Sequence, residues 1–533
     1  MDPSPADVYR RRWWILAVLC LSLLIVFVGN SSLNVAVPTL SRELQATQSQ
    51  LQWVITAYSL VFAGLLLTTG ALGDRFGRKG ALQLGLAIFL VACVVATCSN
   101  SMWQLIACRG AMGVGAALIM PSTLSILVNV FPPHERTKAI AVWATVTGVA
   151  GGFGPVASGF LLTHFWYGSI FLINVPIVAL ALVGGIFILP RSRDPEQARL
   201  DPIGAGLSTV GIVAIVYGLI EAPDNGWGAR TTVGAFVLGG VVLLAFVLWE
   251  LRRDEPMLDI RLFQDRAFGT GTTGMVLIFM SMYGVMFLIS QYLQLVRGYS
   301  PFGAAVRLLP TAPVMICVAP LTPRLSARFG ANRVVGLGLL LDAAGLFALR
   351  ILGTGTSYPF IVLPMMVATA GFGLTMSPLT AAIMSAVPTR RAGSGSAMND
   401  ASRELGAALG VAVMGSIAAS QYRGSVDALT RSLPVSVEGV ARSSLAGALR
   451  VAQSVPPGLG RALASGAESA FIDGIHVAVT AGATFAVIAA VITWRFLPNT
   501  FEHQASLHDP VAALEGVAEL GLGGVPPVFA ETD

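Results

Sequence analysis

The sequence is dominated by long apolar runs that are separated by short charged loops. Fourteen runs can be counted, and they have the length of membrane-spanning helices, which need about 20 apolar residues. Their approximate ranges are 13–37, 52–72, 81–98, 102–129, 139–164, 169–189, 203–220, 232–249, 268–295, 303–322, 334–351, 358–386, 396–420 and 474–496. The pattern predicts an all-α polytopic membrane protein.

The composition excludes a soluble globular protein. The chain has 533 residues, of which 55% are hydrophobic and 11% charged, whereas soluble domains carry about 25% charged residues. The net charge of +5 does not indicate a nucleic-acid partner, because the arginines are spread over many loops. The five cysteines have neither disulfide nor metal-ligand spacing.

Basic residues alternate between the two sides of the predicted spans. They are concentrated in the loops at 75–79, 136–138, 191–199, 252–266, 324–333 and 390–391. By the positive-inside rule these loops are cytoplasmic, which places both termini in the cytoplasm. The run after Arg10–Arg12 is too long for a signal peptide and lacks a cleavage site, so we expect an uncleaved first span.

The most distinctive loop is the stretch 70–81, GALGDRFGRKGA. Its glycines permit a tight turn, and its cations indicate the cytoplasmic side. Asp74 could lock this hinge through charge-assisted hydrogen bonds to a neighbouring helix end. The alternative is a solvated turn that only fixes topology. The positions concerned are Gly70, Gly73, Asp74, Arg75, Gly77, Arg78 and Lys79.

This loop resembles the loop 2–3 signature of the major facilitator superfamily. In that family the Asp and the first Gly help to hold one of two alternating conformations. A weaker copy at 327–330, ARFG, repeats DRFG at 74–77. The resemblance implies two six-span halves with two extra central spans. We expect the parts to be 1–195, 196–255 and 256–498, with an external flap or short hairpin at 423–473 and a disordered cytoplasmic tail at 499–533.

Further stretches resemble the fourteen-span drug:proton antiporters, close to the exporters of quaternary ammonium compounds and dyes. They are LNVAVP at 33–38, FLINVP at 171–176, PMLDIRLF at 256–263 and QYLQ at 291–294. Two acids that this branch often has are missing, because Gly29 and Thr56 stand in their places. We therefore expect a weaker preference for cations.

The fourth and fifth runs contain unusual residues. Arg109 lies inside the fourth run, where a charge costs about 2.5–3.5 kcal/mol on insertion scales. It should therefore face a cavity or a partner and take part in proton coupling, unless it is a packing residue paired with backbone carbonyls. It resembles the family's fourth-span motif, although Met112 stands where Gln is usual. Gly154-Pro155 in the fifth run resembles the antiporter motif and favours export over uptake; the alternative is ordinary close helix packing.

Three acidic residues are predicted at membrane depth. Asp400 and Glu404 are spaced i,i+4 and share one helix face. Two partly desolvated carboxylates cannot both ionise cheaply, so the pair could carry the coupling proton, and this antiporter branch has acids at both positions. Arg403 could pair with Asp400. Asp342 lies within the run 334–351 and is either a transport residue or a carboxyl satisfied by a neighbouring helix.

These observations favour a proton-coupled exporter of amphipathic or cationic small molecules in a bacterial inner membrane. We expect a monomer that contacts membrane lipids and protons, has no cofactor and is not an enzyme, because no catalytic set, metal cluster or nucleotide-binding loop is present in the sequence. The alternatives are an exporter of one endogenous lipid or antibiotic, and a non-transporting receptor or scaffold. The predicted polar handles of the cavity are Asn34, Tyr58, Met112, Gln291 and Gln294.

Overall fold

The computed structural model describes residues 5–190, 201–253, 256, 258–387, 392–431 and 433–499. In this part of the chain every regular secondary-structure element is a helix, and 13 helical segments are long and apolar enough to cross a membrane. The other predicted span, 139–164, lies within the 32-residue helix α5. The predicted all-α membrane architecture is therefore confirmed.

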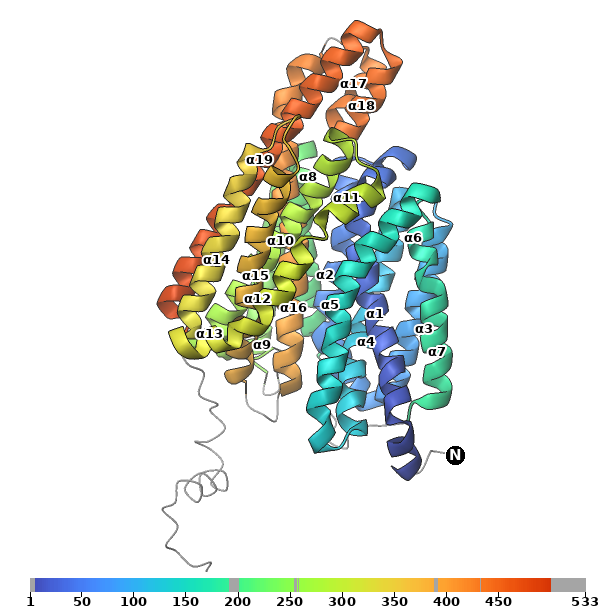
Figure 1. Cartoon of the computed structure of the whole chain (residues 1–533), viewed down its shortest axis with the longest axis vertical. Coiled ribbons are helices and arrows are strands. Elements are labelled where there is room, and N and C mark those ends of the chain that lie inside the picture. The colour runs from blue at the N-terminus through green and yellow to red at the C-terminus, as the bar shows by residue number, and fades with distance from the viewer. Residues whose placement is uncertain are drawn as a thin grey trace, which may run out of the picture.

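The first helices of the chain form one bundle (Figure 1). They are α1 (Pro5–Glu43), α2 (Gln48–Phe76), α3 (Arg78–Thr97), α4 (Met102–Val130), α5 (Pro133–His164), α6 (Ser169–Leu172) and α7 (Asn174–Ile188). In this N-terminal half, α4 packs against α2 and α3, while α1 packs against α5 and α7. Close approach of α3 and α4 depends on Gly85 and Gly115, since a Cβ on either would lie 2.8 Å from the other's carbonyl oxygen.

Two further helices, α8 (Pro202–Asn225) and α9 (Arg230–Leu251), come before the second bundle. This C-terminal half contains η1 (Ile260–Gln264), α10 (Arg266–Gln291), η2 (Tyr292–Val296), α11 (Pro301–Leu308), α12 (Thr311–Val318), η3 (Ala319–Leu321), α13 (Thr322–Phe329), α14 (Ala331–Ala348), η4 (Leu349–Ile351), α15 (Pro359–Ser385), α16 (Ala392–Thr430), α17 (Val435–Ser443), α18 (Leu445–Ser454) and α19 (Pro457–Phe496). Here α16 packs against α10 and α19, and α14 packs against α15 and α19.

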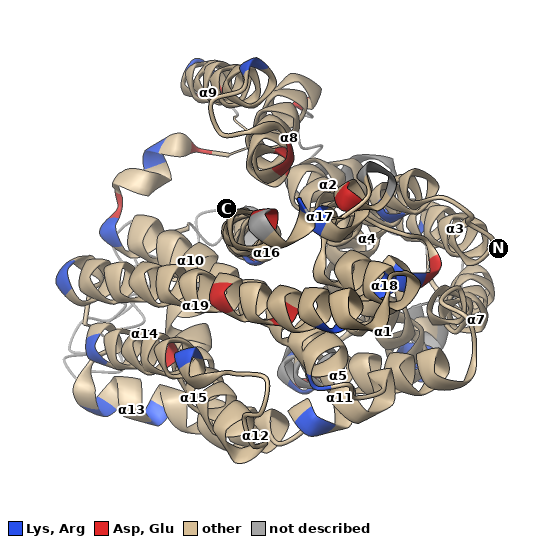
Figure 2. Ribbon diagram, turned by 90° about the horizontal axis from the view of Figure 1, so that it is seen from above, with Lys and Arg blue, Asp and Glu red and all other residues tan. Residues whose placement is uncertain are grey.

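The inserted pair α8–α9 lies at the periphery (Figure 2). Helix α8 packs against α2 of the N-terminal half and α16 of the C-terminal half, and α9 packs mainly against α8. The outer face of α9 carries exposed apolar side chains such as Val237, Val241 and Leu244, as expected for a helix that faces lipid. The predicted boundaries near 195 and 255 and the predicted tail beyond Asn499 lie outside the described residues.

The predicted external loop 423–473 is a helical extension of the bundle. Helices α16 and α19 continue past the other helices, and α17 and α18 pack between them at the end that we call the hairpin end (Figure 1). Tyr422 donates a hydrogen bond to the carbonyl of Ala441 at 2.9 Å, and Asp427 pairs with Arg442 at 2.9 Å. The segment is therefore an ordered, packed element and more extensive than the flap or short hairpin that the sequence suggested.

The opposite end of the bundle, which we call the loop end, contains the turn between α2 and α3. Helix α2 ends at Phe76 and is capped by Gly77, which has a φ of 112°, and α3 begins at the next residue. The weaker sequence copy has the same arrangement, because α13 ends at Phe329 and is capped by Gly330 with a φ of 88°, and α14 follows at once. Both turns use glycine because a side chain is strained at a positive φ. The sequence echo is thus also a structural echo.

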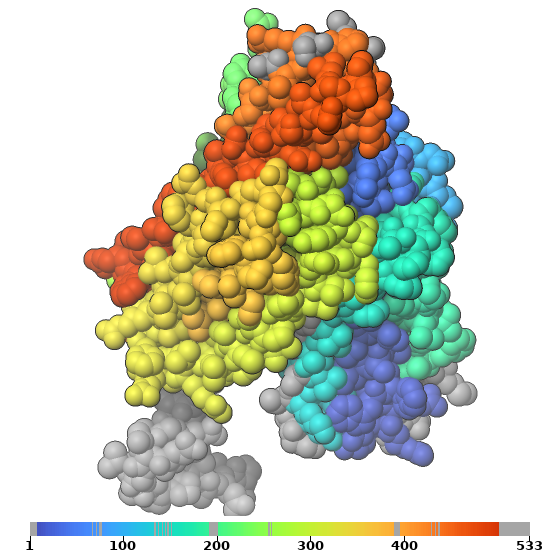
Figure 3. All heavy atoms as spheres, turned by 45° about the horizontal axis from the view of Figure 1, so that its top comes forward, coloured from blue at the N-terminus to red at the C-terminus, as the bar shows by residue number. Residues whose placement is uncertain are grey.

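The two halves are joined near the hairpin end. Ser290 donates to the carbonyl of Asn34 at 2.6 Å, and Gln294 donates to the carbonyl of Val35 at 2.9 Å. On the α5 side, the Phe302 amide donates to Thr163 at 3.3 Å. In the space-filling view the halves touch across their upper part and separate toward the lower edge (Figure 3). This conformation is closed at the hairpin end.

Candidate functional site

Arg109 of α4 is completely buried in the N-terminal half. Its Nε donates to the carbonyl of Val54 at 3.0 Å, and its Nη1 donates to the carbonyl of Gly29 at 3.1 Å. Its Nη2 lies 3.5 Å from Oδ1 of Asn30. The guanidinium also lies 4.4 Å from the centre of the Tyr58 ring, at cation–π distance. Backbone acceptors and one aromatic ring therefore solvate this charge.

The two positions at which the sequence comparison expects acids, Gly29 and Thr56, differ in their relation to Arg109. Gly29 offers its carbonyl oxygen to the guanidinium, and the Thr56 hydroxyl donates to the carbonyl of Gln52 instead of facing Arg109. Within the described part of the chain, Arg109 forms no ion pair within 4.0 Å. The observed partners match the packing alternative, and a role of Arg109 in proton coupling stays a prediction.

The predicted acid pair on α16 is divided between two environments. Asp400 lies 3.5 Å from Nη1 of Arg403 and accepts a 3.4 Å hydrogen bond from Asn399. Glu404 is partly exposed, lies beside the Ser59 hydroxyl of α2, and has a buried oxygen, Oε2, without a hydrogen-bond partner. Asp400 is therefore charge-compensated within the C-terminal half, whereas Glu404 faces the N-terminal half with spare hydrogen-bonding capacity.

An aromatic cluster on α10 and α15 accompanies these acids. The rings of Phe279 and Tyr283 are stacked with centroids 5.8 Å apart, and Phe372 lies 5.2 Å from Phe279. The Arg403 guanidinium lies 6.0 Å from the centre of the Phe279 ring. The sequence reading missed this cluster, although the i,i+4 spacing of Phe279 and Tyr283 was a usable signal.

Asp342 of α14 is fully buried behind α10. Ser281 donates a 2.6 Å hydrogen bond to its Oδ2, and Oδ1 has no partner. Backbone atoms of Gly371 in α15 pack directly against this residue, because a Cβ at position 371 would lie 2.5 Å from the Asp342 amide nitrogen. A neighbouring helix therefore provides a hydrogen bond to one carboxyl oxygen of Asp342 and leaves the other without a partner. Both a role in transport and a purely structural role for Asp342 stay predictions.

The predicted gating residues are found in two places. At the loop end, Gly73 packs against Ser122 of α4, and Lys79 donates to the carbonyls of Ile186 and Leu189 at 2.8 Å. The predicted positions Gly70, Gly77 and Arg78 belong to the same helix–turn–helix, and the side chains of Asp74 and Arg75 lie outside the described residues.

The second place is the crossing of α1 and α5. A Cβ on Gly154 would clash with Ser31 Oγ, and Ser32 lies 3.4 Å from the carbonyl of Gly154. Pro155 follows inside the helix. The glycine permits close approach of α5 to α1 near the centre of the N-terminal half.

The predicted cavity residues are largely buried in this conformation. Tyr58 donates to the carbonyl of Val26 at 3.0 Å, and Met112 Sδ lies 4.0 Å from Nη1 of Arg109. Gln294 and the backbone of Asn34 belong to the closure at the hairpin end, and Gln291 donates to its own helix at Phe287. Their role in substrate binding stays a prediction.

Comparison with known proteins identifies the relatives of this chain. The family model of the Major Facilitator Superfamily matches residues 19–411. The multidrug efflux pump LfrA of Mycolicibacterium smegmatis is 33% identical, over 92% of this chain and 97% of its own. The methyl viologen resistance protein SmvA of Salmonella typhimurium is 33% identical, over 91% and 98%. The tetracenomycin C resistance and export protein of Streptomyces glaucescens is 31% identical, over 92% of each chain.

Solved structures share the fold. A bacterial homolog of the human lysosomal transporter Spinster, in an inward-facing and unoccupied conformation, superposes with a TM-score of 0.62 at 18% identity, covering 91% of this chain and 98% of that one. The xylose transporter XylE of E. coli, in an inward-open conformation, gives 0.54 at 14% identity, covering 92% and 97%. At these identities the likeness concerns the helical architecture alone.

The environment of Arg109 predicts that Arg109→Lys destabilises the protein. A lysine cannot reach the carbonyls of Val54 and Gly29 together with Asn30, and a hydrogen bond to a charged group contributes about 1.5–3 kcal/mol. We expect a lower melting temperature of the purified protein in detergent. Arg350→Lys, at an exposed position on η4, is the matched control. Equal melting temperatures for the two variants would show that the three acceptors do not depend on the guanidinium.

Proposed function

Because this chain belongs to the Major Facilitator Superfamily, we propose that it exports amphipathic small molecules from a bacterial cell in exchange for protons. The observation that supports this most directly is Glu404 of α16, which lies beside Ser59 of the other half and has a spare buried oxygen, while the neighbouring Arg403 lies over the ring of the stacked Phe279–Tyr283 pair. A carboxyl that can bind either a proton or a cationic group suits antiport, and aromatic rings suit flat apolar bodies. Export names among the relatives support the direction.

We place the loop end in the cytoplasm and the hairpin end outside the inner membrane. The basic loops of the described chain, such as 75–79 and 324–333, support this orientation. The conformation closed at the hairpin end is then the one that receives substrate from the cytoplasm. Rocking of the N-terminal and C-terminal halves would open the hairpin end and release substrate outside, which is the alternating-access scheme of such transporters.

Within this proposal Glu404 carries the coupling proton, and Asp400 supports it. Asp400 already has Arg403 as a counter-charge, whereas ionised Glu404 has the Ser59 hydroxyl and no guanidinium within 4.0 Å among the described residues. Protonation removes the cost of keeping that charge in a partly dry site. Opening the seam between α2 and α16 would expose Glu404 to a different environment, so proton affinity and conformation are coupled.

Glu404→Gln is therefore expected to abolish substrate accumulation driven by an imposed pH gradient in inside-out vesicles, while Asp400→Asn retains part of it. Asp473→Asn, an exposed acid of α19, controls for loss of a carboxylate elsewhere in the C-terminal half. Gradient-driven transport that survives in the Asp400→Asn, Glu404→Gln double variant would contradict the assignment and point to Asp342.

The loop-end turn is proposed to control exchange between conformations. Gly73 lies close to Ala81 of α3 and Ser122 of α4, far along α2 from Ser59, the neighbour of Glu404, so Asp74 should act on the transition and not on substrate contact. Asp74→Asn should abolish transport while equilibrium substrate binding changes by at most a few-fold, with Asp473→Asn as the control in both assays. A collapse of binding affinity would mean that the residue acts on the substrate site instead.

Substrate charge is the third testable consequence. Glu404 forms no ion pair among the described residues, whereas Arg403 compensates Asp400, and the positions of Gly29 and Thr56 carry no charge. Neutral and monovalent amphiphiles should compete well for export, and a dication should compete poorly. Competition by methyl viologen in vesicles checks this, and SmvA, which is named for methyl viologen resistance, is a suitable reference protein.

Export of one endogenous product is a second candidate function. It is favoured by the relative named for tetracenomycin C export, which matches along 92% of this chain. A panel of chemically unrelated amphiphiles distinguishes the two, because a dedicated exporter would respond to one scaffold and a multidrug exporter to several. Active accumulation of any substrate in vesicles excludes the receptor or scaffold alternative.

A further inference from the structure

The inserted helix α8 is bound to both halves of the transporter near the hairpin end. On one side, Trp53 of α2 donates from its indole Nε1 to Glu221 at 3.0 Å. On the other side, Ser416 of α16 donates to the carbonyl of Leu219 at 2.6 Å. These two bonds are made by residues of the same turn of α8, so a single helix end connects elements that must separate when the hairpin end opens.

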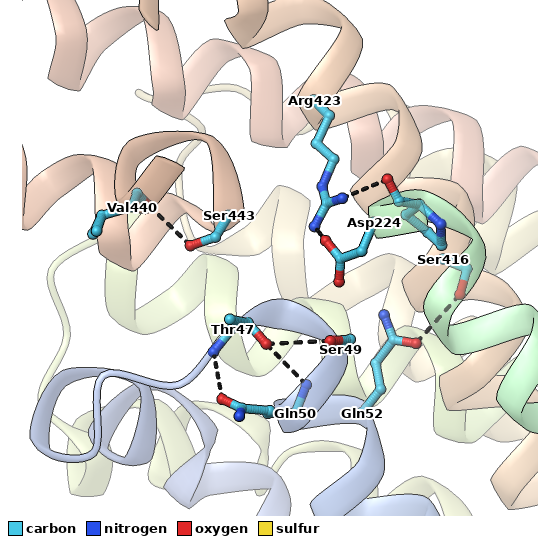
Figure 4. A network of polar contacts seen from close by, with 10 residues as sticks. Thr47, Ser49, Gln50, Gln52, Asp224, Ser416, Arg423, Val440 and Ser443 are labelled. Carbon is cyan, nitrogen blue, oxygen red and sulfur yellow. Dashed lines mark hydrogen bonds and ion pairs between the residues drawn. The ribbon is translucent and has the colours of Figure 1, made fainter. Parts of the chain in front are cut away.

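The last turn of α8 is attached more strongly to α16. Arg423 forms an ion pair with Asp224 and also donates to the carbonyl of Pro223 (Figure 4). Trp227, just beyond α8, donates to Ser420 at 3.2 Å. The Arg423 side chain is 14% exposed and that of Asp224 is 28% exposed, so this pair is shielded more than an ordinary surface ion pair.

Helices α2 and α16 also meet directly behind this contact. Oε1 of Gln52 lies 3.3 Å from the Ser416 hydroxyl (Figure 4), and a Cβ on Gly415 would lie 2.9 Å from Cδ of Gln52. The amide nitrogen of Gln52 is buried without a partner. Ser416 therefore touches α2 and α8 at once, and the three helices form one polar cluster.

Apolar residues continue this three-way contact toward the membrane interior. Leu60 of α2, Val216 and Ile220 of α8, and Ala408 and Ala412 of α16 form a buried cluster. The small side chains on α16 let α8 lie close along the seam between α2 and α16. Separation of α2 from α16 at this seam consequently has to rearrange α8 as well.

We propose that α8 is a latch that holds the transporter closed on its outer side. The latch consists of Trp53, Glu221, Asp224, Ser416 and Arg423. Among the described residues, α8 is held to α16 by an ion pair and further hydrogen bonds, and to α2 by the Trp53–Glu221 bond and side-chain packing, so α8 is expected to move with α16. The Trp53–Glu221 and Gln52–Ser416 contacts then break when the outer side opens. The proposal goes beyond the export function and rests on the proposed external position of the hairpin end.

The test measures opening of the outer side without substrate or pH gradient. A reporter thiol is introduced by Ser290→Cys in a background that lacks the five native cysteines. Ser290 is 4% exposed and lies in the closed seam between α1 and α10, so a membrane-impermeant maleimide added from outside reacts with it only after opening. The labelling assay does not depend on transport. Its result can therefore be interpreted even if the protein proves not to export amphipathic molecules.

Trp53→Phe should increase the labelling rate about five-fold, the change in an opening equilibrium expected from loss of roughly one net hydrogen bond. Arg423→Gln should also increase labelling, because an α8 that is released from α16 can stay with α2, so the Trp53–Glu221 bond need not break on opening. The charge exchange Asp224→Arg with Arg423→Asp should return labelling to the parent rate. Arg431→Gln is the matched control, because Arg431, one residue beyond α16, pairs with Asp427 of α16 itself at 3.2 Å.

Unchanged labelling in Trp53→Phe and Arg423→Gln would overturn the latch. The same would follow if Arg431→Gln increased labelling as much as Arg423→Gln, since the effect would then come from charge loss in the hairpin. Failure of the charge exchange to restore labelling would also contradict a direct role of the Asp224–Arg423 pair. Melting temperatures of all variants identify any that fail to fold, and the charge exchange tests the pair with both charges kept.

Discussion

The cost of leaving a polar group without a partner in an apolar interior governs this structure. A bilayer provides no water to its core, so helices satisfy their own backbone and buried side chains must find partners on other helices. Arg109 meets this requirement fully, with two carbonyls, one amide oxygen and one aromatic ring. The groups that do not meet it include Oε2 of Glu404, Oδ1 of Asp342 and Nε2 of Gln52.

These unsatisfied atoms lie at positions where side chains must change their hydrogen-bond partners during the proposed transport cycle. Glu404 and Gln52 lie on the seam between α2 and α16, and Asp342 lies behind the helix that carries Tyr283. A fully satisfied group favours one arrangement, whereas a group with spare capacity can exchange partners at a small cost. The surroundings of Arg109 and the seam between α2 and α16 thus contain the same kinds of polar residue. They differ in how many of the buried polar atoms have a hydrogen-bond partner.

The two seams between the halves are closed differently. On the α5–α11 side, Gly159 packs against the backbone of Pro301, and the Phe302 amide reaches Thr163. On the α2–α16 side, α8 adds a third helix with an ion pair and several hydrogen bonds. The inserted helices therefore add contacts to one of the two seams between the halves and not to the other. Substitutions in α8 can consequently change the stability of the α2–α16 seam without altering the α5–α11 seam.

The sequence alone determined the membrane spans, the tight turns at Gly77 and Gly330 and the positions of the buried charges, because transfer free energy and backbone conformation are local properties. It did not determine which groups would meet. Arg109 finds Gly29 on α1, Glu404 finds Ser59 on α2, and Asp224 finds Arg423 across about 200 residues of chain. Helical spacing placed Asp400 and Glu404 on one face, but only the packing of α2, α10 and α15 around α16 gave the two carboxyls different surroundings. Tertiary structure decides such partners because they belong to helices whose mutual arrangement no local pattern encodes.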